Sequence, residues 1–144
     1  MKLSTKCRYG LRAVIEIART HGHGPAKRKD IAAVQELSDS YLENILIILK
    51  NNRIIETTRG VNGGYILSKN PSEITVLDIV NCLEGPPELT ECVGQPSTCD
   101  RSVTCVARTV WQEVTDAWRQ ILEKTTIQDL LDREAKMRSY SYTI

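Results

Sequence analysis

The sequence predicts a mainly α-helical protein that contains a winged helix-turn-helix and a long C-terminal helix. Two short apolar stripes at helical spacing lie close together within residues 30–50, and a Gly-rich turn between two strand-like runs follows them. A third apolar stripe, with alternating spacings of three and four residues, covers residues 105–124. We therefore divide the chain into a winged-helix domain at 1–83, a cysteine loop at 84–104, and a dimerisation helix with a tail at 105–144.

The first predicted helix begins after Ser4 or Thr5, either of which can cap its free N–H groups, and runs to about Thr20. A Gly- and Pro-rich segment ends it. That segment contains His21 and His23, which could bind one metal ion together. Because no third ligand lies nearby in the sequence, we interpret the segment as a solvated loop.

The helix-turn-helix is predicted from two neighbouring apolar faces, one around Ile31 and one from Leu42 to Leu49. Ser38 can cap the second helix, and Asp39 adds negative charge where the helix dipole favours it. The N-terminal residues of such a second helix read the major groove of DNA, where Asn can pair with adenine and Glu can accept a hydrogen bond from cytosine. The residues that we expect to face DNA are Ser38, Asp39, Ser40, Tyr41, Glu43 and Asn44.

A hairpin follows directly and completes a winged helix. Residues 54–58 and 65–67 have strand character and flank a Gly-rich turn that begins at Arg59. An arginine at the tip of a wing suits a narrow minor groove or a phosphate. The alternative interpretation is a small helical core with a surface hairpin that does not bind DNA. The other residues that we expect to contact DNA are Lys2, Arg28, Arg59 and Gly60.

The charges are distributed unevenly, although the formal net charge is only +1. Residues 1–70 contain 12 Lys and Arg against 6 Asp and Glu, a net of +6, and the remainder contains 7 against 12, a net of −5. A basic half that carries the helix-turn-helix suits a phosphate backbone. The acidic half is therefore not expected to face DNA.

The composition also bears on compartment and activity. No apolar run approaches the ~20 residues of a membrane span, and the N-terminus lacks the apolar core of a signal peptide. We expect a cytoplasmic protein without a membrane partner, in which the five cysteines do not form structural disulfides. No Ser/His/Asp or paired-carboxylate arrangement stands out, so an enzyme is not expected.

The cysteine loop follows a short helix predicted from Thr75 to Leu83 and carries Cys92 and Cys99, with Cys105 at its end. The spacing C-x6-C-x5-C fits structural zinc poorly, since zinc sites use closer pairs. Iron–sulfur clusters are held by thiolates but need four ligands, and three thiols could also form a redox switch. Spacing and ligand softness favour an iron–sulfur cluster over thiol redox chemistry. We predict [2Fe–2S] rather than [4Fe–4S].

The last long helix is expected from Cys105 to about Lys124, followed by a helix that Thr126 caps and a tail that is loose or docks on a partner. The apolar stripe of the helix at 105–124 is wider than one small domain needs to cover its own core, so a second copy of the chain would bury it. We therefore expect a homodimer on a palindromic duplex. The stripe comprises Val106, Ala107, Val110, Trp111, Val114, Ala117, Trp118, Ile121 and Leu122.

Four motifs resemble those of the Rrf-two (Rrf2) family of bacterial transcription regulators: MKLSTK from Met1, RY from Arg8, SYLE from Ser40, and RG followed by GGY from Arg59. The likeness covers essentially the whole chain. It implies a homodimeric winged-helix repressor or activator with a long dimerisation helix. It also implies that the three loop cysteines match the cluster ligands of the IscR and NsrR types, which the cysteine-metabolism (CymR) type lacks.

At the positions of the fourth cluster ligand, this sequence differs from both the IscR and the NsrR types. Arg108 stands where IscR-type members have a histidine, and Arg8 stands where NsrR-type members have an aspartate; neither can ligate a metal. Cys7 is one candidate, although its position on an apolar face favours a buried thiol, and Glu91, Asp100 and a glutamate from a partner helix are others.

The sequence thus predicts a transcriptional regulator, a repressor with activation also open, whose DNA binding responds to iron–sulfur or redox status. A nitric-oxide-responsive or thiol-redox regulator of the same fold is the alternative. A second hypothesis belongs to a different functional class. The loop cysteines would also fit a small redox or metal-binding protein that docks a partner through its basic half.

Overall fold

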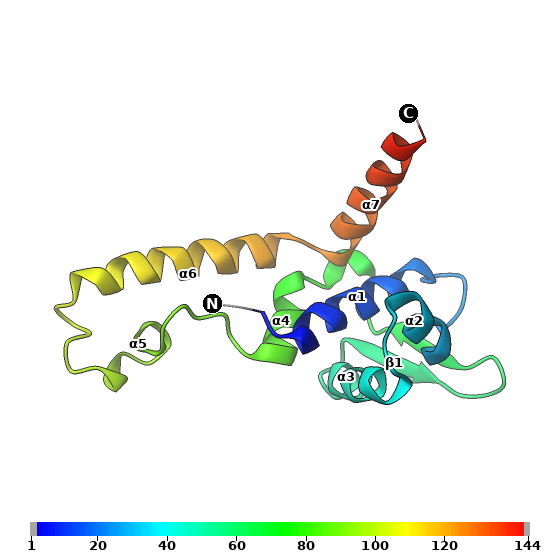
Figure 1. Cartoon of the computed structure of the whole chain (residues 1–144), viewed down its shortest axis with the longest axis horizontal. Coiled ribbons are helices and arrows are strands. Elements are labelled where there is room, and N and C mark those ends of the chain that lie inside the picture. Colours follow the sequence, from blue (N-terminus) through cyan, green and yellow to red (C-terminus); the bar gives the residue numbers. More distant parts are fainter. Residues whose placement is uncertain (1–2, 143–144) are drawn as a thin grey trace.

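The computed structural model describes residues 3–142, which are mainly helical, as the sequence predicts. The strands within these residues form one antiparallel pair. Figure 1 shows α1 to α4 and the sheet gathered in one body, from which α6 and α7 extend in different directions. In chain order the elements are α1 (Thr5–Arg19), α2 (Arg28–Gln35), α3 (Asp39–Asn51), β1 (Ile55–Thr58), β2 (Gly64–Leu67), η1 (Pro71–Glu73), α4 (Val76–Glu84), α5 (Glu91–Gly94), η2 (Pro96–Thr98), α6 (Val106–Lys124) and α7 (Ile127–Ser141).

Helix α1 forms the centre of the body. The Ser4 side chain caps it by accepting a hydrogen bond from the Cys7 N–H at 3.1 Å. Gly10 lies where α1 meets α4, and a Cβ atom there would come within 2.2 Å of the Leu83 Cδ1 atom. The two helices can therefore approach closely. The largest fully buried side chains around them include Ile17, Leu42, Ile45, Leu46, Leu49, Ile55 and Ile79.

Helices α2 and α3 form the predicted helix-turn-helix. Helix α2 ends at Gln35. The next residue, Glu36, caps it in the left-handed conformation with φ of 53° and turns the chain sharply. The Ser38 hydroxyl then caps α3 by accepting a hydrogen bond from the Tyr41 N–H at 3.3 Å. Because the stripe from Leu42 to Leu49 is buried, the opposite face of α3 and its N-terminus remain at the surface.

The predicted wing consists of β1 and β2, paired from Ile55 opposite Leu67 to Thr58 opposite Gly64. The segment before α2 joins this hairpin through two backbone hydrogen bonds of 2.8 Å between Ala26 and Tyr65. A Cβ atom on Gly64 would lie 2.4 Å from the Ala26 carbonyl oxygen, so this close approach requires glycine. The start of α2 and the turn end of the wing are thereby fixed to each other.

The prediction that residues 84–104 form an irregular loop was only partly correct, because the segment contains α5 and η2. It also packs along α6, as Figure 1 shows. Thr115 of α6 is fully buried and accepts a hydrogen bond from the Leu89 N–H at 3.3 Å. Side chains of α6 therefore satisfy backbone groups of the segment, an interaction that no local sequence pattern reveals.

The chain rejoins the body between α6 and α7, and the first residue of α7 enters the core. The Val76 N–H donates to the Thr125 carbonyl at 2.8 Å, and the Ile127 N–H donates to the Ile74 carbonyl at 2.9 Å. Ile127 is fully buried in the core, and Thr126 caps α7, as predicted. No helix within residues 3–142 is both long and apolar enough to span a membrane.

Candidate functional site

The N-terminus of α3 presents a row of polar side chains at the surface of the body. Asp39, Ser40 and Asn44 are exposed and Glu43 is partly exposed. Tyr41 has a different place, because its ring packs edge-on against the Tyr9 ring with the centroids 6.3 Å apart. The polar row can therefore reach a ligand, while Tyr41 anchors the start of the helix to α1.

Arg28, at the start of α2, binds the two acidic side chains of that row. Its Nε and Nη2 atoms lie 2.9 and 2.7 Å from the two carboxylate oxygens of Asp39, and its Nη1 atom lies 2.6 Å from Glu43 Oε1. The hydrogen bond to Asp39 raises the pKa of Arg28. The sequence predicts all three residues at the DNA interface, but it does not reveal that they pair with one another. The pairing offsets negative charge where a phosphate backbone would approach.

A basic groove lies between the start of α2 and the turn end of the wing. Lys27, Arg28 and Lys29 line it on one side and Gly63 and Gly64 on the other, around a cavity of about 350 Å³. Arg59 and Gly60 are exposed at the turn of the wing. Lys2, which we also expected to contact DNA, lies outside the described residues. Cations, backbone N–H groups and an exposed helix terminus thus share one face, a combination that suits the phosphates and base edges of a duplex.

Two of the loop cysteines, Cys92 and Cys105, lie beside the first turn of α6. Cys105 precedes that helix directly, and Cys92 lies in α5, where its Sγ atom is 3.3 Å from the Thr90 hydroxyl. Arg108 joins the two by donating from Nε to the Cys92 carbonyl at 2.7 Å. Cys99 is exposed, whereas Cys92 and Cys105 are half-buried. Within residues 3–142, the structure does not gather three or more metal-ligating side chains into one group.

Cys7, a candidate fourth ligand, is a core residue with 2% of its surface exposed. Burial is the main cause that raises the pKa of its thiol to about 11, and the charge of Glu84 adds to the effect. The thiol is therefore protonated at neutral pH. This environment matches the buried-thiol interpretation of Cys7, and burial also raises the pKa of Cys82.

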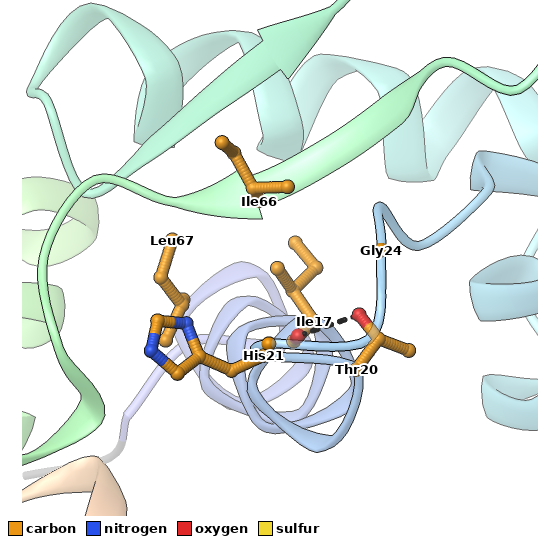
Figure 2. A pocket seen from close by; sticks show the side chains of 7 residues that line it. Ile17, Thr20, His21, Gly24, Ile66 and Leu67 are labelled. Carbon is orange, nitrogen blue, oxygen red and sulfur yellow. Dashed lines mark hydrogen bonds between the residues drawn. The ribbon is translucent and has the colours of Figure 1, made fainter.

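The two histidines of the loop after α1 lie apart from the cysteines. Both are exposed, and the His21 Nε2 atom is 3.3 Å from the Asn70 Oδ1 atom. Figure 2 shows His21 beside a small pocket of about 200 Å³, where Ile17, Ile66 and Leu67 provide apolar walls. Among the residues that line the pocket, Thr20 and His21 have polar side chains.

Comparison with known proteins identifies the family. The profile of the Rrf2 family, described as "Iron-dependent Transcriptional regulator", matches residues 3–133. The chain belongs to the Rrf2 family. The resemblance inferred from the four motifs is therefore confirmed, and so is the winged-helix fold. The protein is a transcriptional regulator of this family, and its homologues are regulators rather than enzymes.

The relatives include regulators of the CymR and IscR types. The regulator CymR of Bacillus subtilis (strain 168) is 37% identical over the full length of both chains. Its structure, titled as that of the global cysteine regulator, aligns with a TM-score of 0.80 at 38% identity and covers 92% of this chain and 98% of that one. The structure of T. potens IscR aligns with a TM-score of 0.76 at 33% identity, covering 93% and 88%. An oxidised form of Staphylococcus aureus CymR aligns with a TM-score of 0.72 at 36% identity, covering 90% and 95%.

Proposed function

We propose that this Rrf2-family regulator binds a palindromic duplex as a homodimer and that an iron–sulfur cluster on Cys92, Cys99 and Cys105 sets its DNA affinity. The observation that carries this proposal is the attachment of the cysteine segment to α6. Arg108 holds the Cys92 carbonyl and Thr115 holds the Leu89 N–H. Any change in the conformation of the segment is therefore transmitted to α6.

The donor set suits an iron–sulfur cluster in chemistry, although the three thiols must move together to share one. Thiolates are the ligands that such clusters use, and Arg108 supplies a positive charge beside Cys92 and Cys105. Exposure of Cys99 leaves it free to close on the other two. A bound cluster would supply a redox- and iron-sensitive crosslink of the segment. We favour [2Fe–2S] over [4Fe–4S], with a fourth ligand from a carboxylate, a partner chain or solvent in place of the buried Cys7.

Helix α6 links the segment to the DNA-reading body. Its stripe exposes Val106, Val110 and Val114, of which Val106 is 80% exposed in the single chain. Burial of this stripe against a second copy would give the homodimer. The C-terminal end of α6 continues into Thr125 and Ile127, which hydrogen-bond to residues next to α4. The angle of α6 therefore influences the distance between the two reading heads, and this distance must match the half-site spacing of DNA.

In this proposal the reading heads use the groups that surround the basic groove. Ser40 and Asn44 are exposed on α3 and can reach base edges, while Lys27, Lys29 and Arg59 can bind phosphates or the minor groove. Arg28 has a positioning role, since it neutralises Asp39 and Glu43. Release of Glu43 from Arg28 would free its carboxylate to accept a hydrogen bond from cytosine.

Thiol redox sensing is the second candidate, and two observations favour it. Cys99 is exposed and Cys92 and Cys105 are half-buried, so oxidants can reach the segment. In addition, the chain is 37% identical to CymR and resembles the oxidised form of a CymR protein. In this case two loop thiols would lose two electrons and two protons to an oxidant such as a peroxide or disulfide, and would form a disulfide.

Iron and sulfide analysis of anaerobically purified protein separates the two candidates. We expect iron and sulfide with visible absorption in the wild type, and loss of both in Cys92→Ala, Cys99→Ala and Cys105→Ala. Cys82→Ala, which removes a thiol outside the segment, serves as the control and should retain both. Full retention in all three loop variants would overturn the cluster proposal, and so would stoichiometric zinc. A metal-free protein that forms a loop disulfide, seen by mass spectrometry, would establish the second candidate instead.

A further inference from the structure

A surface cavity of about 640 Å³ lies between α1, the C-terminal end of α2 and α7. It lies within the size range of small-molecule sites. Its apolar lining comes from Ile15, Val34 and Leu130, and Val34 is 59% exposed in an otherwise amphipathic helix. Neither the basic groove nor the cysteine segment uses these residues. Helix α6 contributes no residue to the cavity, so the proposed dimer stripe does not overlap it.

One wall of the cavity carries a buried acceptor without a partner. Gln35, the last residue of α2, is 8% exposed, and its Nε2 atom donates to Glu16 Oε1 at 2.7 Å. Its Oε1 atom is buried and has no hydrogen-bond partner among the described residues. Exchanging the two amide atoms would turn an oxygen toward the Glu16 carboxylate, so the orientation is fixed. Buried acceptors without partners are rare in folded proteins and need an explanation.

The charges around the cavity are arranged in two groups. Its lining contains four arginines (Arg12, Arg19, Arg133 and Arg138) and two glutamates (Glu16 and Glu134), a net charge of +2. Arg19 binds both glutamates, with its Nε atom 3.0 Å from Glu134 Oε2. Within residues 3–142, Arg12 and Arg133 are in no ion pair. The cavity therefore offers two cations outside ion pairs, of which Arg12 lies 5.3 Å from the centre of the Tyr9 ring, together with a carboxylate. The Gln35 amide oxygen lies buried in its wall.

We propose that this cavity binds an α-amino acid with an apolar side chain. The carboxylate of the amino acid would bind Arg12 and Arg133. Its ammonium group would bind the Glu16 carboxylate and, once the Gln35 side chain turns toward the cavity, the buried Gln35 Oε1 atom. The apolar side chain would cover Ile15, Val34 and Leu130. A zwitterion with an apolar body meets all three requirements, whereas a simple anion leaves the Gln35 acceptor unpartnered.

The position of Gln35 connects this site to the helix-turn-helix. Gln35 is followed by the left-handed turn at Glu36 and then by Ser38, which caps α3. On the other side, the chain Gln35–Glu16–Arg19–Glu134 links α2 through α1 to α7. An amino acid bound to Gln35 would fix the end of α2, and through the turn it would fix the presentation of α3. The site would act independently of the cysteine segment.

Calorimetric titration of the full-length protein with L-leucine, L-isoleucine, L-methionine and L-phenylalanine tests the proposal. We expect saturable binding of at least one of them below about 10 mM. The matched probes for leucine are leucinamide, which lacks the carboxylate, 4-methylpentanoate, which lacks the ammonium group, and glycine, which lacks the apolar body. Each should bind at least about tenfold more weakly than leucine. Absence of binding for all four amino acids would overturn the proposal, and equal binding of leucinamide would overturn the role of the arginines.

Two variants on α7 separate this site from a general effect of charge. Arg133→Met removes a cation that lines the cavity, whereas Lys136→Met removes an exposed cation of the same helix outside it. We expect about tenfold weaker amino-acid binding for Arg133→Met and no change for Lys136→Met, with melting temperatures close to that of the wild type in both. Binding to Arg133→Met as tight as to the wild type would contradict the proposed orientation. Because the readout is direct binding, its failure leaves the iron–sulfur proposal unaffected.

Discussion

The body and the arm of this molecule differ in how well one chain completes them. In the body, formed by α1 to α4 and the wing, Leu46 and Ile79 are fully buried. In the arm, formed by α6 and the cysteine segment, Thr115 is the only α6 residue that the described chain buries, while Trp111 and Ile121 are 40% and 65% exposed. The body is therefore a closed core, whereas the arm leaves an apolar surface exposed in the single chain.

Disrupting the arm should have the largest effect, because we propose that a second copy of the chain covers it. Val114→Asp together with Ile121→Asp places two charges in the stripe and should convert the dimer into monomers, as measured by sedimentation. The control is Val61→Asp, which places a charge at a 97% exposed apolar residue of the wing turn. It should leave the mass unchanged. A dimer that persists in the double variant would show that the interface lies elsewhere.

Truncating a buried side chain in the body should lower the stability of the fold and leave the arm unaffected. Leu46→Ala removes a fully buried side chain from the core and should lower the free energy of unfolding by about 2–5 kcal/mol. Ile121→Ala, an equally large truncation on the exposed stripe, should lower the stability of the isolated monomer much less. Urea denaturation of both variants measures this difference in the background of Val110→Asp and Val114→Asp, which places two charges in the stripe and leaves Ile121 unchanged. Equal losses would mean that α6 belongs to the same core as the body.

Removing a cation from the wing should weaken DNA binding without changing the fold. Arg59 is exposed at the turn, so Arg59→Ala leaves the core intact. If Arg59 binds a phosphate, affinity should fall similarly for all duplexes and the salt slope should fall by about one. If it enters the minor groove, the loss should depend on sequence. Lys136→Ala, on the acidic half, is the matched control. Wild-type affinity of Arg59→Ala for operator and random DNA alike would exclude both roles.

In metal-free protein, the cysteines of the arm should be alkylated faster than the buried cysteine of the body. Cys99 is exposed and should react first, followed by the half-buried Cys92 and Cys105. Cys7 should react last, since it is buried and its pKa is raised to about 11, which leaves little thiolate at neutral pH. Mass spectrometry after timed labelling gives the order. Early labelling of Cys7 in the native protein would mean that α1 separates from the core.

Sequence patterns predicted the features that depend on nearby residues. The Ser38 cap, the buried stripe of α3 and the wing around Gly64 follow from local spacing and turn chemistry. The pairing of Arg28 with Asp39 could not be predicted in this way. It depends on how the starts of two helices face each other, which the packing of the body decides.

The arm was harder to predict, because its contacts join residues far apart in the sequence. Leu89 and Thr115 form one hydrogen bond, and Ile127 enters the core beside Ile74. The cysteine spacing indicated a ligand set, but a spacing does not determine how far apart the thiols lie in the folded chain. The three candidate ligands therefore remain a proposal, whereas the winged-helix fold is confirmed.

Selection of duplexes from a random DNA library, carried out anaerobically with iron-loaded and with metal-free protein, tests the central claim most directly. The account predicts palindromic sites whose half-sites are about one helical turn apart. It also predicts that the affinity for the selected sites differs between the two forms by about tenfold or more, equivalent to about 1.4 kcal/mol. Identical sites bound with identical affinity by both forms would contradict the claim that the cysteine segment controls the reading heads.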